Sequence, residues 1–434
     1  MTSQASPPAP TRIRPLGRLL GLDVVRALAI LAMIYIHVLP TGWLAPILPP
    51  ASPVPVLGWL QENLPSRPMS LFVLCAGLSA ALMTGGTKAP TGHAMTITRR
   101  RLAMRSFALL PFSLYMDGIG EPILMWYFVW FLLLIPVLGL SAKTLFITSG
   151  IMTVANPIIT LVVLNYAGGF AREFYTYPPV SGFDVLLSPA DWPAWLLFYT
   201  THPQMLYALP LLLTGFAIGR LDLNNHLLRL RMIKLGLAGL VTSLAVSWFV
   251  ATPLGVLEEL RPPGSGVPGT ADSGPVPWAS LLMAPPHQLY ALSIPMVVMS
   301  LSIASLLLGG FLIIMDKSPW NRLLWPLAAT GSLALTIYVG HFLALMPFGE
   351  PPFSFNIFAS FLLFALVFAT MWRNWARRGP LEWFVHQVIM ITVPDRKGAE
   401  AAKKAKEAKE SKEPEGPEEP ASAVREQSDQ PAQA

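Results

Sequence analysis

The chain alternates between long apolar stretches and shorter polar or Pro-rich connections. A helix of about 20 apolar residues is long enough to cross the hydrocarbon core of a bilayer. Windows of that length predict about ten membrane-spanning helices, and hence an all-α polytopic membrane protein. We place them near residues 19–40, 69–84, 102–118, 121–139, 143–166, 202–221, 233–253, 287–315, 324–347 and 353–372.

Basic residues mark one side of this arrangement. With ten spans, every cluster of Lys and Arg falls on the same side, which the positive-inside rule makes cytoplasmic. Both termini are therefore predicted to be cytoplasmic. The clusters lie at residues 12–18, 88–105, 220–234, 317–322 and 373–378.

The two ends of the chain differ from the apolar part. Residues 1–11 are rich in Ser, Pro and Ala, and residues 395–434 are charged, apolar-poor and interrupted by Pro. Such compositions cannot bury a core, so we expect both ends to be disordered. The membrane domain is then predicted over residues 12–394, with 381–393 as a helix lying on the inner membrane surface.

Composition supports this reading. The chain is 53% hydrophobic and 12% charged, whereas soluble domains carry about 25% charged residues. The net charge of +6 does not indicate a nucleic-acid partner, because the basic residues lie at helix ends. We expect the plasma (inner) membrane as the location. Cys75 is the single cysteine, which leaves no disulfide framework and no cysteine metal site.

The first predicted helix carries three ionisable residues. Asp23 and Arg26 are three positions apart, and His37 follows Arg26 by eleven. At about 100° and 1.5 Å per residue, all three share one face, with about 16 Å between Arg26 and His37. Ionisable groups inside a span are functional candidates by default. Two simpler interpretations remain, namely an Arg26 that anchors to lipid phosphate and a His37 that only hydrogen-bonds between helices.

Four histidines lie at a similar depth in the predicted topology. His202, His287 and His341 join His37 in the outer half of the membrane or at its outer mouth. Their spacing matches no metal-ligand pattern, so we expect no metal. A general base for a hydroxyl group needs only one or two imidazoles.

The inner loop between the second and third spans contains a run of arginines, Arg99, Arg100, Arg101 and Arg105. The simple interpretation is a topological anchor. The alternative is a site for a polyanion such as the phosphates of coenzyme A, which guanidinium groups bind in a bidentate manner. Stripes of small residues in the second and ninth spans are compatible with a homodimer.

The segment around these residues, "GLDVVRALAILAMIYIH", resembles the first span of membrane-bound acyltransferases, of both the acyltransferase-3 and the heparan-α-glucosaminide N-acetyltransferase-like families. The shared features are Asp23, Arg26 and a histidine after an R-x₁₀-H spacing, with Ala27 where Gly is usual. The segments "GSLALTIYVGHF" and "WARRGPLEWFVH" are similar to the YeiB-like bacterial membrane family.

The resemblance implies a mechanism. Acyl-CoA, most simply acetyl-CoA, would dock from the cytoplasm near Arg99–Arg105, and His37 would act as base or transient acyl carrier. The acceptor would be a hydroxyl or amine of an extracytoplasmic glycan or lipid. The predicted site comprises catalytic His37, His341 and His287 and substrate-binding Asp23, Arg26 and His202.

Two other functions fit the same sequence. A transporter or flippase of an envelope lipid or small metabolite is suggested by intramembrane charges and by a weak echo between "HPQMLYALP" and "HQLYALSIP", because internal repeats are common in transport folds. A non-catalytic partner in an envelope-assembly complex is the third possibility.

Overall fold

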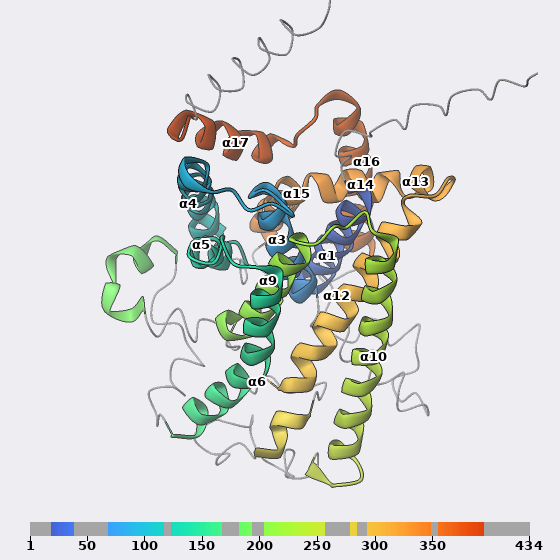
Figure 1. Ribbon diagram of the computed structural model, residues 1–434. Coiled ribbons are helices and arrows are strands. Elements are labelled where there is room, and N and C mark those ends of the chain that lie inside the picture. The colour runs from blue at the N-terminus through green and yellow to red at the C-terminus, as the bar shows by residue number, and fades with distance from the viewer. Residues whose placement is uncertain are drawn as a thin grey trace, which may run out of the picture. The chain divides into compact units, whose positions relative to one another are not determined.

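The computed structural model describes residues 19–38, 68–116, 123–166, 182–192, 204–256, 278–283, 293–348 and 355–394. These residues form helices and connecting turns, with no strand among them, so the predicted all-α class is confirmed for this part of the chain (Figure 1). The predicted disordered ends, 1–11 and 395–434, lie outside it. The α-helices are α1 (Leu20–Val38), α3 (Pro68–Met83), α4 (Gly92–Met116), α5 (Ile123–Leu134), α6 (Ala142–Tyr166), α9 (Gln204–Gly219), α10 (His226–Ala251), α12 (Ile294–Ile314), α13 (Trp320–Leu323), α14 (Trp325–Ser332), α15 (Ala334–Leu345), α16 (Phe355–Trp375) and α17 (Pro380–Thr392). Short 3₁₀ helices are η1 (Gly182–Leu187), η2 (Pro189–Asp191), η3 (Trp278–Leu282) and η4 (Met346–Phe348).

Each of the ten predicted segments overlaps one or two of the α-helices. Among the described residues, four helices are long and apolar enough to cross a membrane, namely α6, α10, α12 and α16. A fifth candidate is the pair α14 and α15, which is bent by 79°. Helices α3, α5 and α9 are apolar but shorter. The described part of the chain is therefore helical and membrane-like, with four or five candidate spans by length and composition.

Helix α1 lies at the centre of the described helices. It contacts α3, α12, α14, α15 and α16, and Val24, Val25 and Ile30 are fully buried. Its surface therefore faces other helices on most sides. The ionisable side chains of α1 are placed inside the bundle, where partners from several helices can reach them.

Close helix contacts depend on glycines at two crossings. A Cβ atom added at Gly77 of α3 would lie 2.0 Å from the carbonyl oxygen of Leu212 in α9. A Cβ added at Gly331 of α14 would lie 1.7 Å from the carbonyl oxygen of Asp23 in α1. Only a residue without a side chain permits these approaches, in the manner of small-residue packing between membrane helices.

The ninth predicted span is not a straight helix. It breaks at Leu333, where φ is −110° and ψ is 35°, and the chain turns from α14 into α15. The new N-terminus leaves backbone N–H groups without intrahelical partners. The carboxylate of Glu382, in α17, accepts hydrogen bonds from the N–H groups of Leu335 (2.8 Å) and Thr336 (3.2 Å). A distant side chain thus stabilises the break.

Candidate functional site

The ionisable residues of α1 are bound to neighbours inside the bundle. Arg26 pairs with Asp23, with 2.9 Å between Nη1 and Oδ1, and Asp23 is 2% exposed. Arg26 also donates to the hydroxyl of Ser79 in α3, which in turn donates to the carbonyl of Cys75. The guanidinium is therefore held by an acid and a hydroxyl of the protein itself. Arg26 thereby links α1 to α3.

His37 and His341 form the most informative contact. Their side chains come from α1 and α15, 304 residues apart in the chain, and Nδ1 of His37 lies 2.9 Å from Nε2 of His341. The two rings are nearly parallel, with 7° between their planes. Such a hydrogen bond needs one donor and one acceptor, so a single proton lies between the two nitrogens. The structure thus pairs two residues that the sequence analysis placed among the catalytic candidates.

The two imidazoles differ in their surroundings. His341 is 3% exposed, while His37 is only partly buried. The outer nitrogen of His341, Nδ1, makes no close hydrogen bond and faces the carbonyls of Ile337 and Tyr338. The ring of Phe342 packs against both histidines. The pair consequently has two outer nitrogens, His341 Nδ1 and His37 Nε2, that are not used in the mutual bond.

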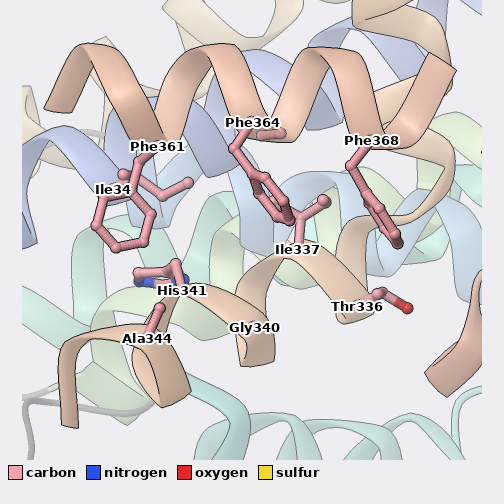
Figure 2. A pocket seen from close by; sticks show the side chains of 10 residues that line it. Ile34, Thr336, Ile337, Gly340, His341, Ala344, Phe361, Phe364 and Phe368 are labelled. Carbon is pink, nitrogen blue, oxygen red and sulfur yellow. The ribbon is translucent and has the colours of Figure 1, made fainter. Parts of the chain in front are cut away.

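A cavity of about 200 Å³ adjoins the pair. Its walls come from α1, α15 and α16, and His341 forms part of its lining (Figure 2). Figure 2 shows three aromatic side chains of α16 that project toward α15, namely Phe361, Phe364 and Phe368. The histidine pair is thus packed between helices on one side and adjoins open space on the other.

The arginines of the predicted coenzyme A site separate into two groups. Arg99 and Arg100 are exposed, whereas Arg101 and Arg105 are partly buried. Arg101 donates from Nε to the carbonyl of Val393, 3.3 Å away, just beyond the end of α17. Residues four apart share a helix face, which explains why these two turn inward together.

Arg105 occupies an apolar setting. Its guanidinium carbon lies 5.7 Å from the centre of the Phe131 ring, and its buried Nε has no hydrogen-bond partner. Arg26 and Glu382 are close enough for their charges to interact with the guanidinium of Arg105. Of the four arginines, Arg105 is the one with a buried N–H group, Nε, that lacks a hydrogen-bond partner among the described residues. It is therefore the best candidate for a buried group that binds an anion.

His202 and His287 lie outside the described residues, so their predicted roles remain predictions. Glu382 was not among the site residues predicted from the sequence. Its signal is that it is the one acidic residue between positions 351 and 394, in an otherwise apolar amphipathic helix. The group of His, Cys, Asp and Glu side chains needed for a metal ion is not found in the described part of the chain.

Fold and site define a helical, membrane-like protein with a histidine pair between its helices. Residues 276–392 match the family described as "Protein of unknown function (DUF418)", so the chain carries a DUF418 domain, and the similarity to the YeiB-like family is confirmed for this region. The domain includes His341 and Glu382 but not α1. Neither acyltransferase family matches the chain. A comparison with curated proteins finds no match.

Proposed function

We propose that the protein is an integral-membrane acyltransferase of the plasma (inner) membrane, with ten spans and both termini in the cytoplasm. It moves an acyl group, in the simplest case acetyl, from cytoplasmic acyl-CoA to a hydroxyl or amine of an extracytoplasmic glycan or lipid. The observation that carries this proposal is the His37–His341 contact of 2.9 Å beside a cavity. Two imidazoles joined in this way are suited to moving a proton during acyl transfer.

The outer nitrogens suggest how the pair works. Nε2 of His37 takes the proton of the acceptor hydroxyl or amine as its oxygen or nitrogen attacks the thioester carbonyl, and the proton shared between the rings shifts from Nδ1 of His37 to Nε2 of His341. The carbonyls of Ile337 and Tyr338 face Nδ1–H of His341 and stabilise the positive charge that this ring then carries. The bond from carbonyl carbon to sulfur breaks, the coenzyme A thiolate leaves, and the shared proton returns to His37 as Nε2 of His37 delivers a proton to the thiolate. Atoms and charge balance without a covalent enzyme intermediate.

The arginines of α4 provide a place for the donor. Guanidinium groups bind phosphates in a bidentate manner, and Arg99 and Arg100 are exposed for that purpose. Arg105, with its unused Nε, lies deeper and closer to α1. In the proposal, the phosphates of acyl-CoA bind the outer arginines, and the thioester arm passes Arg105 and Arg26 toward His37.

The test is acyl transfer from radiolabelled acetyl-CoA by the purified protein in nanodiscs. The wild type should release free coenzyme A and label an acceptor lipid or glycan, and His37→Ala should lose this activity while it retains its melting temperature. His226→Ala is the matched control, because His226 is exposed at the start of α10. A wild type without any dependence on acyl-CoA contradicts the proposal.

One observation favours a transporter or flippase as a second function. Helices α14 and α15 are bent by 79°, and discontinuous helices at membrane depth often form the substrate sites of transporters. The two functions are separated in sealed liposomes. A transporter moves its substrate across the membrane without acyl-CoA, whereas the enzyme consumes acyl-CoA and changes its acceptor covalently.

A further inference from the structure

The cavity beside His341 is built almost entirely from apolar groups. Aromatic and aliphatic side chains from three helices form most of its wall, and His341 and Thr336 are its polar members. The full lining is Ile34, Thr336, Ile337, Gly340, His341, Ala344, Phe361, Phe364, Ala365 and Phe368. A sugar would leave its hydroxyl groups without partners in such a cavity, at a cost of several kcal/mol in free energy.

The polar capacity of Thr336 is already used. Its hydroxyl donates to Oε2 of Glu382 at 2.5 Å and accepts from the backbone N–H of Leu381 at 3.2 Å. The nitrogens of His341 also face the protein. Nε2 lies 2.9 Å from Nδ1 of His37, and the buried Nδ1 faces the carbonyls of Ile337 and Tyr338. The cavity therefore offers a ligand almost only apolar surface, which matches a hydrocarbon chain.

The cavity also communicates with the outer surface of α16. Phe364 lines the cavity and is yet 66% exposed, and its neighbour Leu363 is 64% exposed. Gly340, on the opposite wall, is exposed as well. Helix α16 is one of the four candidate spans, so its exposed apolar face is the face that contacts lipid in a membrane. An occupant can therefore enter between α15 and α16 from the lipid without passing through water.

We infer that this cavity binds one hydrocarbon chain of a membrane lipid. The lining along α15 runs from Thr336 to Ala344, a length of about 12 Å at 1.5 Å per residue. This inference rests on the proposed function in one respect, that the lipid held there is a substrate of the acyl transfer. Binding of the chain does not depend on that step.

The test is a substitution that fills the cavity with a larger side chain on one of its walls. Gly340→Leu adds a side chain where a Cβ meets nothing within 4 Å, so the helix accepts it and the new side chain occupies the cavity. Gly310→Leu is the matched control, because Gly310 is also a helical glycine with open space at its Cβ but lies in α12, away from the cavity lining. Both variants gain the same helix propensity.

The readout is photolabelling in bilayers of phosphatidylethanolamine and phosphatidylglycerol that contain a phosphatidylglycerol with a diazirine on one acyl chain. Peptide mapping should place label on Ile337, Ala344 and Phe361 in the wild type. Gly340→Leu should lose most of this label, and Gly310→Leu should keep it. Label that is confined to the outer face of α16, at Leu363 and Met371, or that is unchanged in Gly340→Leu, overturns the inference.

Acyl transfer is measured on the same samples to separate the two proposals. Label in the cavity without any transfer supports the lipid site and contradicts the proposed enzyme. Transfer that continues at the wild-type rate to a water-soluble acceptor in Gly340→Leu supports the enzyme and contradicts the lipid as substrate. Loss of both label and transfer in Gly340→Leu, with both retained in Gly310→Leu, supports the inference in full.

Discussion

Arg220 and the histidine pair are two buried polar regions that differ in how many partners they have. Arg220 follows α9 and is 8% exposed. Its terminal nitrogens donate to the carbonyls of Thr84 (3.0 Å), Gly86 (2.8 Å) and Leu138 (2.8 Å), and its guanidinium lies over the ring of Phe216. It thereby joins the ends of α3, α5 and α9 through backbone groups that would otherwise lack donors.

The histidine pair is bonded mainly to itself. His37 and His341 share one hydrogen bond, and His341 lines a cavity. A guanidinium whose terminal nitrogens donate to three backbone carbonyls holds helices together, whereas the histidine pair keeps Nε2 of His37 outside its mutual bond and can exchange protons with a ligand there. Arg220 is thus interpreted as a structural residue and the histidine pair as a reactive site. The following predictions test this difference.

The largest effect is expected for His341→Ala. Removal of a general acid–base group lowers the rate of a reaction by about 10²–10⁴-fold, so acyl transfer should fall by at least about 100-fold. If the two histidines act as one unit, the double variant His37→Ala/His341→Ala should be no slower than either single variant. The measurement is transfer from radiolabelled acetyl-CoA, and additive losses would contradict a shared role.

Arg220→Ala should mainly lower stability. Loss of the guanidinium leaves several buried carbonyls without donors, and each such group costs about 1–3 kcal/mol. We expect a loss of about 3 kcal/mol in the free energy of unfolding, measured by denaturation in detergent. Arg231→Ala is the control, because Arg231 is exposed on α10. The acyl-transfer activity per folded molecule should not change. A selective loss of this activity would mean that Arg220 takes part in the reaction.

Glu382→Ala should have a smaller, local effect. Removal of an N-terminal capping acceptor costs about 1 kcal/mol, here at the start of α15. Hydrogen exchange should become faster at the amides of Leu335 and Thr336, which donate to the carboxylate. Glu382→Gln retains one acceptor oxygen and should show an intermediate effect. Unchanged exchange in Glu382→Ala would mean that the break at Leu333 does not depend on α17.

The helices were largely predictable because each apolar window overlaps at least one α-helix of the described residues. The break at Leu333 was not, because the group that caps it, Glu382, lies 47 residues beyond Leu335 and in another helix. The sequence near Leu333 gives no indication of that contact. The hydrophobic pattern of residues 324–347 is continuous, and a window of 20 residues therefore reads it as one span.

The residues of the site could be predicted from the sequence, but the contact between the two histidines could not. Helical spacing placed Arg26 and His37 on one face of α1, and His341 was a candidate because it lies in an apolar segment. Their meeting across 304 residues follows from the packing of α1 against α15, which spacing cannot give. The arginine run was treated as one set, whereas the helix turns Arg101 inward and leaves Arg99 exposed.

The smallest expected effect concerns His386, on the partly buried side of α17. Burial lowers the pKa of His386 below its ordinary value of 6.5, and the charges of Arg378, Arg101 and Arg105 lower it further. Its protonated form is thus disfavoured when α17 is docked on α4. Because docking disfavours the protonated form, the docked state of α17 has its full stability above about pH 6.5 and loses stability as the pH falls below that value.

Hydrogen exchange of α17 measured from about pH 7.5 to about pH 5.5, corrected for the intrinsic pH dependence of exchange, should show this weakening near the histidine pKa. His386→Gln keeps a polar side chain that does not titrate, so its docking should be insensitive to pH over this range. His93→Gln is the control, since His93 is exposed at the start of α4 and should leave the wild-type dependence intact. If His386→Gln retains that dependence, another group on α17 or α4 controls docking, and His386 joins Arg220 among the residues that only support structure.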